Sequence, residues 1–397
     1  MGWTGPAAER KHSTAYYITA IPQGKRHPQF RENVRTCLRA DKLSLRFNPH
    51  FLYQHRDPTM SSRALKTTLH RTLQTFQQPH LHHALAPLTF LRHSSHSPLA
   101  PSTTTRKKIT LPTLLAMHRR HDPITMLTAH DFPSAHLADV AGMDMILVGD
   151  SLAMVALGMD DTSEVRLDEM ILHCRSVARG AKASFLVGDL PMGSYEVSPE
   201  QALESSIRVV KEGRVHAVKL EGGAEMAGQI RKITTAGVAV LAHIGLTPQR
   251  QNALGGFRVQ GKSTTGALKV LRDAIAVQEA GAFGVVLEAI PADVATLVTK
   301  KLRIPTIGIG AGNGCSGQVL VQMDMVGNFP PGRFLPKFVK KYGDVWGEAA
   351  RAVEAYRVEV KDRSYPAPEH TYPMAKEEFL EFERLVEATL PAEGGKL

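Results

Sequence analysis

The segment Met145-Ile-Leu-Val-Gly-Asp-Ser151 contains the pattern that decides the fold, because a short apolar run leads through a glycine to an acid. The same order recurs in Ser184-Phe-Leu-Val-Gly-Asp189, and a third run, Ala217-Val-Lys-Leu-Glu221, also ends in an acid. Longer amphipathic stretches separate these runs. That alternation is typical of parallel strands joined by crossover helices. It predicts an α/β fold that begins near residue 109.

Eight strands can be placed along the chain, at 124–129, 145–149, 184–188, 217–220, 238–242, 284–287 and 306–309, with a weaker one near 325–326. Helices are expected at 168–179, 199–212, 224–236, 264–280 and 292–302. An open doubly wound sheet would have a glycine-rich phosphate turn after its first strand, and none follows residue 129. The later run Gly308-Ile-Gly-Ala-Gly312 lacks the spacing of a dinucleotide motif. The eight units therefore predict a closed (β/α)8 TIM barrel.

Three acids close neighbouring strands of this barrel. Asp150, Asp189 and Glu221 are separated by 39 and 32 residues, each close to one βα repeat. Strand ends meet at the C-terminal face of a barrel, so these carboxylates are expected to converge there. Converging carboxylates repel one another unless a cation joins them, and an all-oxygen set favours Mg²⁺. For any one of these acids, a helix N-cap or a loop turn is the alternative interpretation.

Three further side chains are candidates for the same face. Lys219 lies two residues before Glu221 and so points to the same strand face, where it can meet a substrate carboxylate or form a structural ion pair. Glu288 emerges from an apolar strand, which suits a general base, although a rim or capping carboxylate is the alternative. His243 follows the fifth strand and is an auxiliary candidate as a donor, acid or base, or a rim histidine with its hydrogen bonds satisfied.

The basic charge of the chain belongs to its N-terminal arm. Residues 1–108 contain 17 Lys and Arg against 4 Asp and Glu, whereas the remainder contains 31 against 34, a net charge of −3. A nucleic-acid surface on the catalytic part is therefore not expected. Hydrophobic residues make up 43% of the chain, no apolar run is long enough to span a membrane, and the three widely spaced cysteines do not suggest disulfides.

Residues 60–108 have the composition of a mitochondrial presequence. They contain seven basic residues and no acid, and their apolar side chains recur at helical spacing, at Leu65, Leu69, Leu73 and Phe76. Translation starting at Met60 would make residues 1–59 an extension of doubtful role. A disordered basic tail, with the enzyme in the cytoplasm, is the alternative. The catalytic domain is expected at 109–397, with a C-terminal helical extension.

Seven segments in order resemble the ketopantoate hydroxymethyltransferase family: Val148-Gly-Asp-Ser151, Gly188-Asp-Leu-Pro191, Val218-Lys-Leu-Glu-Gly-Gly223, His243-Ile-Gly-Leu-Thr-Pro-Gln249, Gly255-Gly-Phe-Arg-Val-Gln-Gly261, Leu287-Glu-Ala-Ile-Pro291 and Ile307-Gly-Ile-Gly-Ala-Gly312. The resemblance covers about residues 110–374. It implies a barrel of the phosphoenolpyruvate/pyruvate type and a homodecamer. It also implies transfer of a hydroxymethyl group from 5,10-methylenetetrahydrofolate to 3-methyl-2-oxobutanoate, giving 2-dehydropantoate for pantothenate and coenzyme A synthesis.

The resemblance also implies roles for individual residues. The metal ligands match Asp150, Asp189 and Glu221, the substrate contacts match Asp150, Ser151, Asp189 and Lys219, and the catalytic base matches Glu288. The expected course is removal of the C3 proton by Glu288, a magnesium-stabilised enolate, and attack on a one-carbon unit. A magnesium-dependent lyase of the same superfamily, cleaving a C–C or P–C bond, is the alternative enzyme. It would be expected to use a reactive cysteine in a loop. RNA binding by the basic arm is a non-enzymatic alternative.

Overall fold

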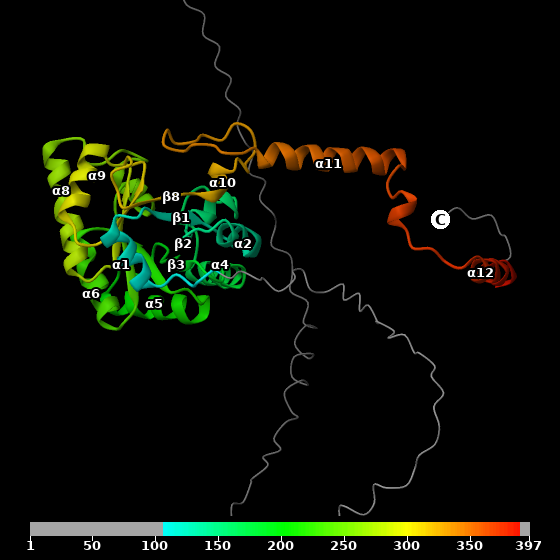
Figure 1. Ribbon diagram of the computed structural model, residues 1–397, viewed down its shortest axis with the longest axis horizontal. Helices are drawn as coiled ribbons and strands as arrows, with labels where there is room; N and C mark the ends of the chain where they lie inside the picture. The colour runs from blue at the N-terminus through cyan, green and yellow to red at the C-terminus, as the bar shows by residue number, and fades with distance from the viewer. Residues whose placement is uncertain (1–105, 390–397) are drawn as a thin grey trace, which may run out of the picture. The chain divides into compact units, whose positions relative to one another are not determined.

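The computed structural model describes residues 106–389, and these residues form a closed barrel of eight parallel strands surrounded by helices (Figure 1). Neighbouring strands pair in chain order, and β8 closes the barrel on β1 with Ile124 opposite Gly317. The strands are β1 Ile124–Thr128, β2 Met145–Val148, β3 Phe185–Asp189, β4 Ala217–Glu221, β5 Ala239–Gly245, β6 Gly284–Glu288, β7 Thr306–Ile309 and β8 Gly317–Leu320. The predicted (β/α)8 fold is confirmed.

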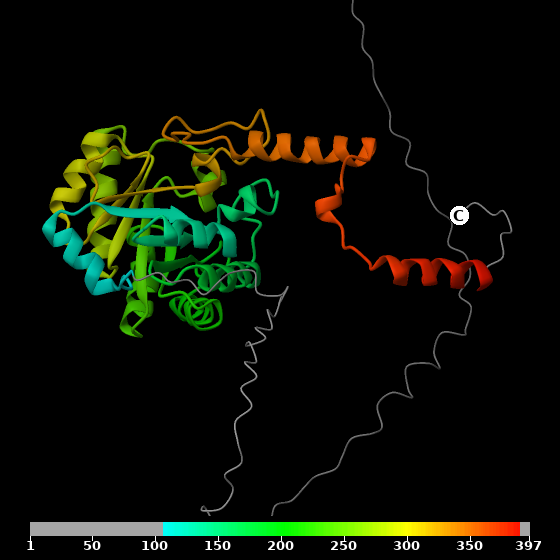
Figure 2. The same ribbon diagram turned by 45° about the vertical axis from the view of Figure 1, so that its right-hand side comes forward.

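Helices follow most of the strands and cover the outside of the barrel, as the turned view in Figure 2 also shows. The longer ones are α1 Leu111–Arg120, α2 Phe132–Val140, α4 Leu167–Gly180, α5 Pro199–Gly213, α6 Ala227–Thr235, α8 Thr264–Glu279 and α9 Ala292–Lys301. Short helical turns are α3 Leu152–Val155, α7 Gln251–Leu254, α10 Gln322–Met325, η1 Ala224–Met226, η2 Pro248–Arg250 and η3 Pro368–His370. The C-terminal part contains α11 Val345–Asp362 and α12 Lys376–Thr389, which bury none of their residues.

Helix starts follow local capping rules. Ser198 accepts a hydrogen bond from the backbone N–H of Gln201 at the start of α5, where Pro199 occupies the first turn. Ser263 caps α8 in the same way, and Asp131 caps α2. Each cap satisfies an amide that has no partner inside its helix, which fixes where the chain turns from loop to helix.

The core has an inner and an outer part. In β2 the side chains of Met145 and Leu147 belong to the cluster inside the barrel, whereas Ile146 and Val148 belong to the cluster beneath the helices. Both strand faces are therefore covered, which explains why the strands appear in the sequence as continuous apolar runs. Leu114 of α1 is fully buried in the inner cluster, and because α1 precedes β1, it closes the N-terminal end of the barrel. The opposite end remains for the site.

The predicted eighth strand was wrong. Residues 322–325 form α10, and the true β8 lies at Gly317–Leu320. That strand is only four residues long and exposes Gln318, so it shows no apolar run. Its glycine is required by packing, since a Cβ at Gly317 would lie 2.3 Å from the carbonyl oxygen of Ile124. The predicted helix at 224–236 is divided into η1 and α6, and the other seven strands are confirmed with ends shifted by three residues at most.

The predictions for residues 1–59 and for most of the presequence segment 60–108 fall outside the described residues. Within 106–389, no helix combines the length and the apolar character that crossing a bilayer demands.

Candidate active site

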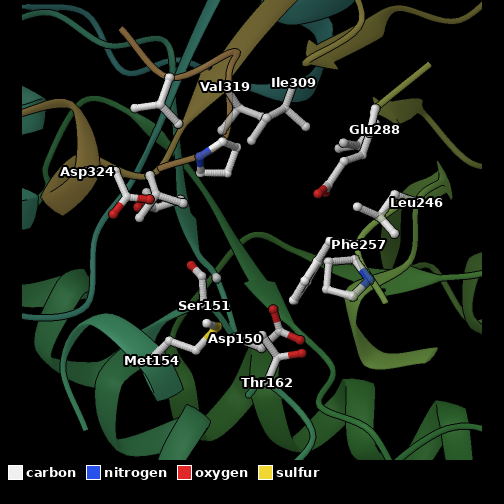
Figure 3. A pocket seen from close by; sticks show the side chains of 18 of the residues that line it. Asp150, Ser151, Met154, Thr162, Leu246, Phe257, Glu288, Ile309, Val319 and Asp324 are labelled. Carbon is white, nitrogen blue, oxygen red and sulfur yellow. The ribbon is translucent and has the colours of Figure 1, made fainter. Parts of the chain in front are cut away.

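The three predicted acids meet at the C-terminal end of the barrel. Asp150 follows β2, Asp189 ends β3 and Glu221 ends β4, and all three side chains are buried. They line one cavity of about 640 Å³, together with Ser151, Lys219, His243 and Glu288. The structure therefore brings together every site residue that the sequence suggested. Figure 3 shows Ser151 beside Asp150, with its hydroxyl directed into the cavity.

Lys219 is the positive charge inside this cluster. Its Nζ lies 2.9 Å from Oδ1 of Asp189, its direct neighbour across the β3 and β4 pair. Burial lowers the pKa of Lys219, but the carboxylates of Asp189, Asp150 and Glu221 outweigh burial, so the net shift is upward. The ammonium therefore stays charged. Lys219 and Glu221 lie on the same strand face, as their spacing predicted.

Asp189 is fully enclosed and only partly satisfied. Its Oδ2 accepts a hydrogen bond of 3.0 Å from the backbone N–H of Asp150. Its Oδ1 accepts no hydrogen bond within 106–389, because the nearby Lys219 ammonium makes a charge contact without hydrogen-bond geometry. Burial raises the pKa of Asp189 to about 7, with Lys219 lowering it and Asp150 raising it further. Burial dominates here over the ion pair, since one lysine is shared among three acids.

Gln249, at the start of the loop after β5, joins the acids together. Its side-chain amide donates to Oδ2 of Asp150 at 2.8 Å and to the Leu190 carbonyl at 3.0 Å. Its backbone N–H donates to Oε2 of Glu221 at 3.1 Å, and its amide oxygen accepts from the Tyr195 hydroxyl at 2.6 Å. Sequence reasoning gave neither Gln249 nor Tyr195 a role, although Gln249 ends one of the motifs that carry the family resemblance.

His243 connects Lys219 with Glu288. Its Nδ1 lies 3.3 Å from the Lys219 ammonium, which can only donate, so Nδ1 is the acceptor. Its Nε2 lies 2.9 Å from the Leu246 carbonyl, which can only accept, so Nε2 is protonated. The contacts therefore select the neutral ring with the proton on Nε2. The same nitrogen lies 3.2 Å from Oε2 of Glu288.

Glu288 ends β6 and lies on another side of the cavity from Asp150 (Figure 3). Its side chain keeps 14% of its surface exposed, against 2% or less for Asp189 and Glu221. Among the described residues, Oε1 of Glu288 has no hydrogen-bond or ion-pair partner. A ligand in the cavity can therefore reach this carboxylate while His243 steadies its other oxygen.

The donor set of the three acids fits a hard divalent cation. Burial and then the charge of Asp150 raise the pKa of Glu221 well above its ordinary value. Three acids with one lysine leave surplus negative charge, and Oδ1 of Asp189 lacks a donor. A cation would relieve both conditions. The side chains are not gathered in advance: within residues 106–389, no three His, Cys, Asp or Glu side chains are close enough to hold a metal ion by themselves.

The rest of the cavity is largely apolar and is lined by two loops. Phe257 and Val259 come from the loop after α7, and Phe334, Phe338 and Val339 come from the segment after α10. Charged side chains interrupt this wall at Asp324, Arg333 and Lys337, and Oδ1 of Asp324 lies 3.2 Å from the guanidinium of Arg333. Sequence reasoning missed this pair.

The two described cysteines lack the features of a nucleophile. Cys174 is fully buried within α4, and burial raises the pKa of its thiol far above the ordinary value. Cys315 is half-buried after the glycine run, and burial raises its pKa as well. Both thiols are therefore protonated near neutrality, and neither is among the residues that line the cavity.

Comparison with known proteins gives a consistent result. The family model described as ketopantoate hydroxymethyltransferase matches residues 108–368. A 3-methyl-2-oxobutanoate hydroxymethyltransferase of Emericella nidulans is 65% identical over 345 residues, covering 86% of this chain and 97% of the relative. The Oryza sativa subsp. japonica protein named 3-methyl-2-oxobutanoate hydroxymethyltransferase 2, mitochondrial, is 54% identical over 268 residues, or 67% of each chain. Among solved structures, a phosphonopyruvate hydrolase in complex with oxalate and Mg²⁺ covers 70% of this chain and 98% of its own, at 17% identity and a TM-score of 0.43.

Proposed function

The chain belongs to the ketopantoate hydroxymethyltransferase family, and from that premise we propose that it transfers a hydroxymethyl group from 5,10-methylenetetrahydrofolate to 3-methyl-2-oxobutanoate. The product is 2-dehydropantoate, an intermediate in pantothenate and coenzyme A synthesis. The observation that carries this proposal is the buried cluster of Asp150, Asp189, Glu221 and Lys219 at one side of a cavity, with Glu288 facing the same cavity from another.

Asp150, Asp189 and Glu221 are the residues that would hold Mg²⁺. Bound there, magnesium would neutralise the crowded carboxylates and draw electron density from the carboxylate and keto oxygens of the 2-oxo acid. Lys219 contributes the permanent positive charge of this side of the cavity, which favours an anionic substrate. Ser151 offers a hydroxyl to the same anion.

Glu288 is the general base of this proposal. It removes the C3 proton of 3-methyl-2-oxobutanoate, and the electrons of that bond form an enolate. Water adds to the methylene carbon of the folate, both carbon–nitrogen bonds of that carbon break, and the two protons of the water return to the two nitrogens, which releases the carbon at the formaldehyde level. C3 then bonds to this carbonyl carbon, and the alkoxide that forms takes the proton held by Glu288 to become the new hydroxyl. Because its ring is neutral, His243 places no positive charge beside Glu288. Its protonated Nε2 lies 3.2 Å from Oε2 of Glu288 and orients this carboxylate, while the other oxygen faces the cavity.

The size of the cavity supports two substrates. A volume of about 640 Å³ is in the range of cavities that bind drug-sized ligands, and a small 2-oxo acid fills only a part of it. The remaining space is lined by apolar side chains such as Phe257, Val259 and Phe338. A flat pterin ring suits such a wall.

The alternative of a magnesium-dependent lyase shares the metal acids but gains no specific support. The reactive loop cysteine expected for it has no counterpart in Cys174 or Cys315, whose thiols are protonated near neutrality. A homodecamer remains part of the proposal on family resemblance alone. So does a mitochondrial location through residues 60–108, which the mitochondrial relatives in plants support in general terms.

The direct test is formation of 2-dehydropantoate from 3-methyl-2-oxobutanoate and methylenetetrahydrofolate by the purified protein. Product is expected with Mg²⁺ and is expected to disappear with a chelator. Magnesium binding itself is followed by calorimetry without substrates, which separates metal binding from turnover. Product formation that is unaffected by chelation would contradict the metal assignment.

A further inference from the structure

Asp324 is an exception among the buried acids of the described chain. Other buried carboxylates accept hydrogen bonds: Asp139 from the amides of residues 182–184, Asp150 from Gln249, and Asp189 from the backbone of Asp150. Asp324 is 7% exposed, and its carboxylate accepts no hydrogen bond within residues 106–389. A buried carboxylate that accepts no hydrogen bond is costly, so the oxygens of Asp324 offer acceptor positions to the N–H donors of a ligand in the cavity.

The position of Asp324 directs it toward the cavity and away from the metal acids. It comes from α10, just after β8, and it lines the same cavity. Figure 3 shows it well separated from both Asp150 and Glu288. Among residues 106–389 its one ion-pair partner is Arg333, at 3.2 Å, on the segment that also contributes Phe334 and Phe338 to the wall. Asp324 thus belongs to the part of the cavity that a small 2-oxo acid at the metal acids would leave free.

We propose that Asp324 and Arg333 bind the hydrogen-bonding edge of the pterin ring of the folate co-substrate. This inference rests on the proposed function and assigns the second half of its site. The pyrimidine edge of a pterin presents the 4-oxo oxygen, the N3–H and the 2-amino group side by side. A carboxylate next to a guanidinium offers two acceptors beside a donor, which complements that edge atom for atom.

Electrostatics agree with this assignment. Burial raises the pKa of Asp324, and the charge of Arg333 opposes the rise. Two N–H donors from a ligand would replace the hydrogen bonds that the carboxylate lost on burial, and would favour its ionised form. Phe338 packs closely over Gly310, where a Cβ would lie 2.7 Å from its ring, so the glycine leaves the space that this aromatic side chain of the wall occupies. Phe334 lines the cavity but is 84% exposed, which leaves apolar surface for a flat ligand to cover.

The competing interpretation is structural, because the pair also ties the segment of Arg333 to α10. A purely structural pair predicts that its loss disturbs the cavity as a whole. A pterin contact predicts loss of folate affinity alone. Enolisation of the 2-oxo acid needs no folate, so exchange of its C3 proton with deuterated solvent reports whether the rest of the site is intact.

The first experiment measures the Kd of tetrahydrofolate for the magnesium-loaded protein by calorimetry, in wild type and in Asp324→Asn. We expect binding to weaken by about 10- to 100-fold, the usual consequence of losing a buried hydrogen bond to a charged group. C3 exchange should stay near the wild-type rate. Asp160→Asn is the matched control, since it removes one negative charge from an exposed acid whose carboxylate has no hydrogen-bond or ion-pair partner among residues 106–389, and it should change neither quantity; the hydrogen bond from its backbone N–H to Glu164 is kept.

The second experiment changes the ligand instead of the protein. A tetrahydrofolate analogue with a methyl group in place of the 2-amino group should bind wild type about 10-fold or more weakly than tetrahydrofolate. The two ligands should differ much less in their affinity for Asp324→Asn, because this variant lacks the carboxylate that accepts the hydrogen bond of the 2-amino group. The wild-type half of this experiment does not depend on the folding of any variant.

Three results would overturn the inference. Equal affinity of wild type and Asp324→Asn for tetrahydrofolate would contradict a contact between Asp324 and the pterin, and so would equal affinity of wild type for both ligands. Loss of both C3 exchange and folate binding in Asp324→Asn would show a structural role. If wild type forms product but draws its one-carbon unit from a donor without a pterin, the proposed co-substrate fails, a result that the product assay separates from failure of Asp324 alone.

Discussion

Two sides of one cavity handle charge in opposite ways. On the side of β2, β3 and β4, three acids and one lysine are buried together, so the formal charge is −2 and two of the carboxylates have raised pKa values. On the side of β5 and β6, Glu288 is partly exposed and its neighbour His243 is neutral by its contacts. The first side has surplus negative charge that a bound cation would neutralise. The second presents a carboxylate oxygen to the cavity. We therefore propose metal binding on the first side and proton transfer on the second.

The largest effect is expected at the base. Glu288→Gln should lower the rate of 2-dehydropantoate formation by about 10² to 10⁴, the usual contribution of a positioned general base. Its magnesium affinity should match wild type, because Asp150, Asp189 and Glu221 are unchanged. Steady-state kinetics and metal calorimetry on the same sample check both statements. Weaker magnesium binding in Glu288→Gln would contradict the separation of metal binding from proton transfer.

Asp189→Asn should have the mirror effect. Removing a carboxylate from a hard cation's ligand set should weaken magnesium binding by about 10-fold or more and lower activity with it. The metal-free variant should be at least as stable as wild type, since the formal charge of the cluster falls from −2 to −1 while Lys219 keeps two acids nearby. Calorimetry and urea unfolding measure these quantities. A large loss of stability in the metal-free state would mean that the ion pair with Lys219 outweighs the repulsion.

Gln249→Ala should show what holds the acids in place. Four hydrogen bonds connect this residue to Asp150, Leu190, Glu221 and Tyr195, and the substitution removes the three made by its side chain. Leaving buried partners unsatisfied should lower the free energy of unfolding by about 1 to 3 kcal/mol. Magnesium affinity should fall as well, because Asp150 loses its orienting donor. Gln249→Glu keeps the size of the side chain but places a further negative charge beside Asp150 and Glu221. It should therefore lower the free energy of unfolding of the metal-free protein more than Gln249→Ala does.

The smallest effect is on the pH dependence of stability. The folded metal-free protein keeps protons on Asp189 and Glu221 that the unfolded chain releases, because the folded pKa of Asp189 is about 7 against 3.8 for the free side chain. More protons bound in the folded state means that the free energy of unfolding falls as pH rises. Urea unfolding between about pH 4 and about pH 7 should show this decline. Asp189→Asn should flatten it, and a wild-type curve that rises over this window would contradict the raised pKa.

Much of the fold and site could be predicted because the deciding residues repeat along the chain. Seven strands appear as short apolar runs, and the repeat spacing of the acids that end or follow β2, β3 and β4 places Asp150, Asp189 and Glu221 at one face. The eighth strand is too short to show a run, so α10 was taken for it, and Asp324 was overlooked for the same reason. Gln249 and Tyr195 act through partners far away in the sequence, such as Asp150 at 99 residues from Gln249, and no local pattern carries that information.

Exchange of the C3 proton of 3-methyl-2-oxobutanoate in deuterated water, followed by proton NMR without folate, tests the division of the cavity most directly. Wild type and the control Asp160→Asn should exchange this proton when magnesium is present. Glu288→Gln should bind magnesium and the 2-oxo acid but lose the exchange, since an amide does not accept a proton near neutrality. Exchange at the wild-type rate in Glu288→Gln would contradict the assignment and make His243 the next candidate for the base.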